Sequence, residues 1–268
     1  MKSSRIDIAA RLRAAGCVFA EDEADLLIAA ASSAAQLDTM VEQRADGFPL
    51  EQVVGWAEFC GLHISVVPGV FVPRRRSEFV VARAIALTRQ RTADRPKVVV
   101  DLCCGTGAIG VAVATALARV EANPPELHAV DIDPTAVACA KSNLASMSGR
   151  AYLGDLYAAL PARLRGQVDL VIANAPYVPT DEIELLPAEA RLHEPRVALD
   201  GGGDGVDVHR KVAAGAPGWL GPDGCLLIET SGRQAALTSA AVSAGGLSAR
   251  IASSDELSAT VVIGTWPD

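Results

Sequence analysis

The last two thirds of the chain alternate between apolar runs and stretches with helical periodicity. The apolar runs span 97–102, 127–131, 168–173 and 224–230, and the helical stretches span 107–119, 134–147 and 205–214. Strands that are buried on both faces are nearly continuous apolar runs, and the helices between them cover a parallel sheet on both sides. The pattern therefore predicts a doubly wound α/β fold. Two β segments near the C-terminus, 247–252 and 258–264, predict an antiparallel edge pair.

The first 73 residues follow a different pattern. Residues 1–48 predict short helices, one opened by the acidic run Glu21 to Glu23 and another closed by Gly47. Around 57–73 the β-rich pieces WAEFCGLHISV and VFVPR predict a hairpin and a connector, and 75–90 predicts a linking helix. We expect a small helical N-terminal domain with its hairpin at 1–73, which docks the substrate, and a larger α/β domain at 74–268.

Composition excludes several classes of protein. A chain of 268 residues that is 50% hydrophobic can form a large core, which argues against disorder. The net charge of -8 argues against nucleic-acid binding through a broad basic surface. The local basic run Arg74, Arg75 and Arg76 is either an exposed loop or a contact for phosphates or an acidic partner. We expect a monomer.

No membrane segment or signal peptide is predicted. Arg5, Asp7 and Arg11 interrupt the N-terminus, and Asp101 with three glycines interrupts the apolar stretch 98–118. We therefore expect a cytoplasmic protein with no membrane contact.

The cysteines do not have the spacing of a metal site, so we expect no metal and reduced, buried thiols. They are Cys17, Cys60, Cys103, Cys104, Cys139 and Cys225.

A glycine-rich turn follows the first parallel strand and predicts a cofactor site. The run DLCCGTG at 101–107 contains Gly105 and Gly107, and with Gly110 it satisfies GxGxxG. Asp131 ends the next strand, where a carboxylate can accept both ribose hydroxyls of an adenosine-containing cofactor. These features fit either a nicotinamide dinucleotide or S-adenosylmethionine. Asp133 with the following proline predicts a helix N-cap.

Asp155 follows the β-like stretch AYLG. Its carboxylate can either meet the adenine amino group of a cofactor or cap the next turn, and the sequence leaves both open.

The quartet Asn174, Ala175, Pro176 and Tyr177 ends the apolar segment VDLVIA. An amide or aromatic amino nitrogen is a weak nucleophile because its lone pair is conjugated. The Asn174 side-chain oxygen and the Ala175 carbonyl can accept both N–H bonds of such a group while the Tyr177 ring stacks on it. Pro176 favours an extended Ala175. The alternative is an ordinary turn, but ligands bind at this end of the strands in open α/β sheets.

Other charged residues near these motifs have simpler interpretations. Arg74 and Glu78 precede a helix and can orient it by charge. His193 and Glu194 lie with the glycine-rich run 200–205 in a long connection, which is either a lid or a flexible crossover.

Eight motifs in family-like order and spacing resemble the protein-(glutamine-N5) methyltransferases that modify the Gly-Gly-Gln loop of peptide chain release factors, with relatives that act on a ribosomal protein. The resemblance runs from about Phe48 to Trp266. Its landmarks are PLEQVVGWAEFCGL, VPRRRSE, DLCCGTGAIG, AVDIDP, GDLY, NAPY, HEP and ALDGGGDGVD.

The resemblance implies a Rossmann-like class I methyltransferase domain of seven strands, the last one antiparallel, behind a helical N-terminal domain. It implies a protein substrate, with Asn174 to Tyr177 holding the substrate amide. It also implies an S-adenosylmethionine site that includes Asn174. The residues expected around this cofactor are Asp101, Cys103, Cys104, Gly105, Thr106, Gly107, Asp131, Ile132, Asp155 and Leu156.

The chain departs from the family pattern at four places. Ala175 replaces the first proline of Asn-Pro-Pro-Tyr, which keeps the carbonyl and adds an N–H donor. Cys103 replaces a customary glycine, Leu156 replaces an aromatic residue, and the family's Pro-Arg-Pro-Asp-Thr-Glu is Pro-Arg-Arg-Arg-Ser-Glu at 73–78. The N-terminal domain is also short.

Three alternatives remain open at this point. One is methylation of an exocyclic adenine nitrogen (N6) in nucleic acid, against which the acidic balance weighs. Another is an NAD-dependent oxidoreductase, suggested by GTGAIG and Asp131. The third is a non-catalytic cofactor-binding module, suggested by Ala175 and Cys103. The preferred hypothesis is glutamine methylation without a general base.

Overall fold

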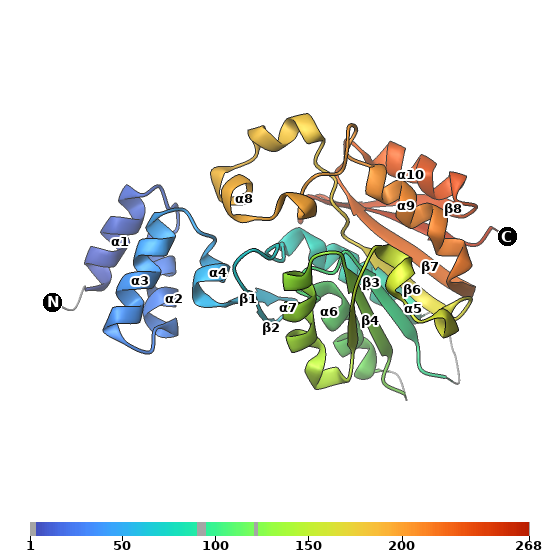
Figure 1. The fold of residues 1–268 in the computed structure, drawn as a ribbon, viewed down its shortest axis with the longest axis horizontal. Helices are drawn as coiled ribbons and strands as arrows, with labels where there is room; N and C mark the ends of the chain where they lie inside the picture. Colours follow the sequence, from blue (N-terminus) through green and yellow to red (C-terminus); the bar gives the residue numbers. More distant parts are fainter. Residues whose placement is uncertain (1–3, 90–94, 121–122, 268) are drawn as a thin grey trace.

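The computed structural model describes residues 4–89, 95–120 and 123–267. These residues form a helical lobe at the N-terminal end and a larger α/β body (Figure 1). The helices of the lobe are α1 (Arg5–Ala14), α2 (Ala20–Ala30), α3 (Ala34–Ala45) and α4 (Leu50–Val54). The predicted short helices are confirmed, with Glu21 to Glu23 in the first turn of α2 and Gly47 directly after α3 at a φ of 92°.

A seven-stranded sheet runs through the described part of the body in the order β5-β4-β3-β6-β7-β9-β8. The strands from β5 to β7 are parallel, and β9 is antiparallel to both β7 and β8. Their bounds are β3 (Val98–Leu102), β4 (Glu126–Asp131), β5 (Arg150–Leu153), β6 (Val168–Ala173), β7 (Leu220–Thr230), β8 (Ser248–Ser254) and β9 (Ala259–Thr265). The predicted class I topology, with its antiparallel last strand, is confirmed.

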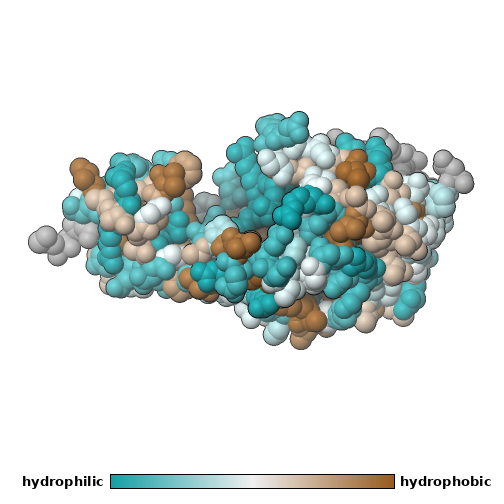
Figure 2. Space-filling view, turned by 90° about the horizontal axis from the view of Figure 1, so that it is seen from above, coloured by the Kyte–Doolittle hydropathy of each residue, from teal (hydrophilic) through white to brown (hydrophobic). Residues whose placement is uncertain are grey.

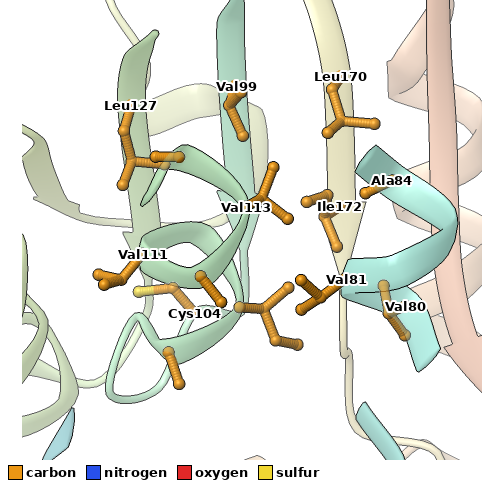
Figure 3. Packing of buried hydrophobic residues seen from close by; sticks show 14 of the residues in the cluster. Val80, Val81, Ala84, Val99, Cys104, Val111, Val113, Leu127, Leu170 and Ile172 are labelled. Atoms are coloured by element: carbon orange, nitrogen blue, oxygen red, sulfur yellow. The ribbon is translucent and has the colours of Figure 1, made fainter. Parts of the chain in front are cut away.

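Helices cover both faces of this sheet. One face packs against α5 (Glu78–Arg89), α6 (Ala108–Ala118) and α7 (Pro134–Leu144), and the other against α9 (Asp207–Gly215) and α10 (Ala235–Ala244). Figure 3 shows Val113 of α6 beside Ile172 of β6, with Val81 and Ala84 of α5 on the other side of Ile172, while Val111 lies on the far side of α6. The sequence of α6, AIGVAVATALA, is apolar all round because α6 is buried between the sheet and its neighbouring helices.

Local signals explain where two of the helices begin. Ser4 and Asp7 form a reciprocal capping box at the start of α1. Asp133 caps α7 by accepting hydrogen bonds from the N–H groups of Thr135 and Ala136, and Pro134 occupies the first turn, as predicted.

The hairpin β1 (Trp56–Phe59) and β2 (Leu62–Ser65) joins the lobe to the body. The lobe has a core of its own, which includes Leu12 and Leu27. Phe59 and Ile64 of the hairpin instead belong to the core on the α5–α7 face of the sheet. The domain boundary at residue 73 stays a prediction, but the hairpin packs with the body.

Two isoleucines of the sheet test how much the core contributes to stability. Ile172 of β6 is fully buried, whereas Ile251 of β8 is 45% exposed. We expect Ile172→Ala to lower the free energy of unfolding by about 2–5 kcal/mol, because it leaves a cavity in the core. Ile251→Ala is the matched control and should cost under about 1 kcal/mol. Equilibrium denaturation with urea measures both, and equal losses would contradict this account of the core.

Candidate functional site

The carboxyl ends of β3, β4 and β6 open into a cavity of about 930 Å³. The chain proceeds from β3 to β4 and β5 on one side and then returns to β6 on the other, so the cavity lies at the topological switch point. It is lined by the whole predicted quartet, Asn174 to Tyr177, and by most of the predicted cofactor residues. The structure therefore brings both sets of sequence-predicted residues to one site.

The glycine-rich turn between β3 and α6 takes backbone conformations that favour glycine. Gly105 and Gly107 have φ angles of 53° and 77°. A Cβ on Gly107 would lie 2.7 Å from the Cδ1 atom of Leu144, so this position is also closed to side chains. Cys103 has a φ of 53° although it is not glycine, which is a strained conformation for a residue with a Cβ.

Asp131 ends β4 beside this turn. Its Oδ2 atom accepts a hydrogen bond of 2.8 Å from the Gly105 N–H, and its Oδ1 atom accepts one of 3.0 Å from the Asp133 N–H. Burial raises the pKa of Asp131, while these backbone donors lower it. Each carboxylate oxygen keeps a further acceptor position, so Asp131 can hold two more hydroxyl groups.

Asp155, Leu156 and Ile132 form another part of the cavity wall. Asp155 sits at the N-cap position of the 3₁₀ helix Leu156–Ala159, but its side chain makes no capping hydrogen bond. The capping role that the sequence left open for Asp155 is therefore not realised. Leu156 has a φ of 46°, a second strained non-glycine residue in this wall. The Ile132 side chain is largely exposed.

Two residues expected around the cofactor do not line this cavity. Asp101 is buried, and its Oδ2 atom accepts a hydrogen bond of 2.9 Å from the Gly110 N–H at the start of α6. Gly107 packs against α7 through the close approach to Leu144. Both residues support the turn from outside the cavity, and their place in the cofactor site stays a prediction.

The quartet follows β6 directly, with Asn174 and Tyr177 half-buried and the two residues between them buried. The Asn174 Nδ2 atom lies 3.4 Å from the Ser77 Oγ atom, to which it donates a hydrogen bond. Burial lowers the pKa of His209 to about 4, and the neighbouring Ala175 backbone opposes the shift only in part. His209 is therefore neutral near pH 7. The Ala175 carbonyl has two lone pairs with which it can accept a substrate N–H.

The glycine-rich run that the sequence left as a lid or a flexible crossover packs tightly on the quartet. A Cβ on Gly201 would lie 2.7 Å from the Tyr177 Cα atom, and one on Gly205 would lie 2.4 Å from the Tyr177 carbonyl oxygen. The Gln234 Nε2 atom donates to this same carbonyl at 2.5 Å. This part of the connection therefore packs directly against the backbone of Tyr177.

The rest of the connection links the cavity to the helical lobe. Helix α8 (Ala188–His193) sits beside the lobe (Figure 1), where Glu189 bonds Arg44 at 3.1 Å and the His193 ring lies 4.1 Å from the Phe48 ring. Glu194, at the end of α8, pairs with Arg74 at 2.5 Å and accepts a hydrogen bond from the Val72 N–H. From the sequence, Arg74 was expected to orient a helix by charge or to belong to an exposed or partner-binding basic run. The sequence did not predict this pairing, because 120 residues separate the partners.

The cysteines are all free, as expected. Cys60 and Cys103 are half-buried, however, so the prediction that every thiol is buried was wrong for these two. Burial raises the pKa of the Cys103 thiol, which keeps it neutral and argues against a thiolate nucleophile in the cavity.

Among the described residues, no three His, Cys, Asp or Glu side chains lie close enough together to hold a metal ion. None of the described helices is long and apolar enough to cross a membrane.

The chain matches the methyltransferase small domain family over residues 64–218. It is 33% identical to the release factor glutamine methyltransferase of Bradyrhizobium diazoefficiens, over 88% of this chain and 84% of that protein. The chain belongs to this family. It is also 37% identical to the Geobacter sulfurreducens enzyme of the same name, over 71% of this chain, and 38% identical to the Streptomyces coelicolor enzyme, over 73%. The aligned segment spans only 63% and 67% of those two proteins.

Solved structures support the fold. The Thermus thermophilus 16S rRNA methyltransferase in complex with AdoMet and guanosine superposes with a TM-score of 0.54 at 18% identity, over 79% of this chain and 50% of that one. A methyltransferase from Pyrococcus furiosus gives 0.53 at 16% identity, over 76% of this chain and 89% of that one. At these identities the likeness shows a shared class I methyltransferase fold.

The residues of the cavity fit S-adenosylmethionine, the cofactor of methyltransferases. A Cβ at Gly105 or Gly107 would be strained at these φ angles, so the turn can pass close to a ligand. Asp131 has free acceptor positions for hydroxyl groups, and Asp155 has a carboxylate with no capping partner. The nicotinamide alternative is therefore replaced by S-adenosylmethionine, because the matching family and relatives are methyltransferases.

The buried carboxyl group of Asp101 makes the stability of the folded protein depend on pH. Burial raises the pKa of Asp101 to about 7, from an ordinary value of 3.8, and this outweighs the opposing Gly110 N–H. The folded protein therefore binds this proton more tightly than the unfolded chain does. Its stabilising effect is complete below pH 3.8 and is lost as the pH rises through about 7.

We expect Asp101→Asn, which cannot ionise, to gain about 2–4 kcal/mol in unfolding free energy relative to the wild type between pH 4 and pH 7.5. Urea denaturation across this pH range measures the difference. The exposed residue Asp223 provides the control Asp223→Asn, which should follow the wild-type curve. A constant difference between Asp101→Asn and the wild type would refute a raised pKa at this position.

Proposed function

We propose that this protein transfers a methyl group from S-adenosylmethionine to the side-chain amide nitrogen of a protein glutamine, in a peptide chain release factor. One observation carries the proposal. The quartet Asn174 to Tyr177 lines the same cavity as the glycine-rich turn and Asp131. An acceptor held by the quartet would therefore face a donor held by the turn. The names of the relatives supply the substrate class.

The cofactor would bind along the ends of β3, β4 and β5. In this proposal the turn from Cys103 to Gly107 passes under the methionine part, with Asp101 and Gly107 holding it in shape. Asp131 accepts the ribose hydroxyls, Ile132 and Leu156 contact the adenine ring, and Asp155 accepts from its amino group. The bound cofactor supplies an electrophilic methyl group on a sulfonium.

The quartet would orient the acceptor. A carboxamide nitrogen is a poor nucleophile, so catalysis depends on aiming it and excluding water. The Asn174 Oδ1 atom and the Ala175 carbonyl accept the two N–H bonds, and the Tyr177 ring stacks on the amide plane. No side chain is assigned as a general base. This role of Ala175 fits its position, because its side chain is buried and its backbone forms the cavity wall.

The helical lobe would help to dock the protein substrate. It contacts α8 through the pairing of Arg44 with Glu189, and α8 leads into the cavity wall at Glu194. Figure 2 shows the hydrophobic residues of the viewed face as scattered patches on a mainly polar surface, with the lobe as a separate projection. A monomeric state and a cytoplasmic location stay part of the proposal.

Asn174→Ala tests the acceptor site. We expect methyl transfer to a release factor to fall by at least about 100-fold, because the amide loses its main orienting oxygen. The dissociation constant for S-adenosylmethionine should stay within a few fold. Asn123 is exposed and far along the chain from the quartet, so Asn123→Ala is a matched control with wild-type activity.

The assay uses labelled cofactor with a release factor, a release factor whose Gly-Gly-Gln glutamine is replaced by alanine, and RNA and DNA as separate acceptors. Mass spectrometry locates the methyl group. Label on nucleic acid, or on the alanine variant of the release factor, would contradict glutamine methylation.

Asp131→Asn tests the cofactor site. The amide keeps one acceptor oxygen and loses the charge, so we expect affinity for S-adenosylmethionine to fall by about tenfold or more. Calorimetric titration measures this, with Asp223→Asn as the exposed control. Unchanged affinity in Asp131→Asn would place the ribose elsewhere.

A further inference from the structure

A buried carboxylate lies behind the quartet and has no part in the site as described so far. Glu229, next to the last residue of β7, is 1% exposed. Its Oε1 atom lies 3.4 Å from the Arg76 Nε atom, and its Oε2 atom is buried without a hydrogen-bond partner among the described residues. Such a group is costly to bury, so its retention needs a reason.

The turn before α5 lies beside this carboxylate. Burial raises the pKa of Glu229, and the charge of Arg76 opposes the shift. Ser77, the next residue of the turn, is itself buried. The turn 75–77 thus brings Arg76 to Glu229, although 153 residues separate them along the chain.

Ser77 orients the side chain of Asn174. The Asn174 Nδ2 atom donates a hydrogen bond of 3.4 Å to the Ser77 Oγ atom. The Asn174 Oδ1 atom, on the other side of the amide, is therefore turned away from Ser77, and Asn174 lines the cavity. In this orientation the amide oxygen is available as an acceptor.

Arg76 also contacts Tyr177, the last residue of the quartet. Its guanidinium carbon lies 5.9 Å from the centroid of the Tyr177 ring, within the range of a cation–π contact. Burial raises the pKa of Tyr177, and the charge of Arg76 lowers it. Arg76 thus contacts both Tyr177 and Glu229.

We propose that the turn 75–77 anchors both ends of the quartet, Ser77 at Asn174 and Arg76, which pairs with Glu229, at Tyr177, and so presents the Asn174 Oδ1 atom to the acceptor. Ser77, Arg76 and Glu229 are positioning residues, since none of them needs to touch the substrate. The inference rests on the proposed function for its acceptor. Hydrogen bonds in a free active site are often long and shorten when the substrate binds, which the 3.4 Å contacts allow.

Activity measurements separate positioning from general stability. We expect Ser77→Ala to lower kcat by about tenfold or more, because the Asn174 amide can then flip, while KM and the dissociation constant for S-adenosylmethionine change less than threefold. Ser77→Thr keeps the hydroxyl and should stay within about threefold of the wild type. Ser243→Ala, at an exposed position of α10, is the control. Equal losses in Ser77→Ala and Ser77→Thr, or wild-type kcat in Ser77→Ala, would overturn the proposal.

The adjacent arginines provide a matched pair for the second contact. Arg76→Ala should lower kcat with the release factor, and Arg75→Ala should not, because Arg75 is exposed and lies outside the cavity wall. If both variants lose the same activity, the basic run acts through its net charge and the anchoring by Arg76 is wrong.

A third measurement does not need an acceptor. We expect the side-chain ¹⁵N amide signals of Asn174, assigned by their loss in Asn174→Ala, to shift and exchange faster with solvent in Ser77→Ala than in the wild type. Unchanged signals would overturn the inference whatever the enzyme methylates. If instead the signals shift while the wild type fails to methylate release factors, the proposed function fails and the anchoring stands.

Discussion

The parallel pairing of β3 with both of its neighbours is the constraint on which the site depends. Leu102 of β3 lies opposite Val130 of β4 and Ala173 of β6. The residues that follow these three therefore leave the sheet at the same level, which brings the glycine-rich turn, Asp131 and Asn174 to one edge. A register shift of one residue would move one strand end by about 3.3 Å relative to its neighbours and so separate the turn, Asp131 and Asn174 from one another.

A second set of contacts comes from segments that the sheet does not align. The turn before α5, the end of α8 and the glycine run after Leu199 all converge on the cavity from far along the chain. Arg74 pairs with Glu194 in its wall, and Gly201 and Gly205 lie against Tyr177. These contacts decide which way the quartet faces. They also explain why the long connection is ordered where it meets the quartet, since its glycines lie too close to Tyr177 for side chains to fit.

The site includes several features that cost stability. Cys103 and Leu156 have left-handed backbone conformations, and Asp101, Glu194 and Glu229 are carboxyl groups whose pKa values burial raises. Strain and buried charge of this kind persist only where the surrounding structure holds them. Here the covering helices supply that support, because α6 and α7 pack directly against the cofactor turn. The strained and charged residues at the switch point therefore destabilise the fold, and the apolar core on either side of the sheet offsets this.

Much of this molecule follows from its sequence alone. Apolar runs of strand length, separated by helical periods, determine a parallel sheet, and the carboxyl ends of such strands meet at one edge, so the turn at Gly105, Asp131 and the quartet could be predicted to lie together. Only the tertiary structure decided that Asp101 lies beneath the turn, that Asp155 caps no helix, and that Ser77 contacts Asn174 while Arg76 contacts Glu229. Periodicity reports which face of an element is buried, but these hydrogen bonds join partners 97 and 153 residues apart, which no local pattern records.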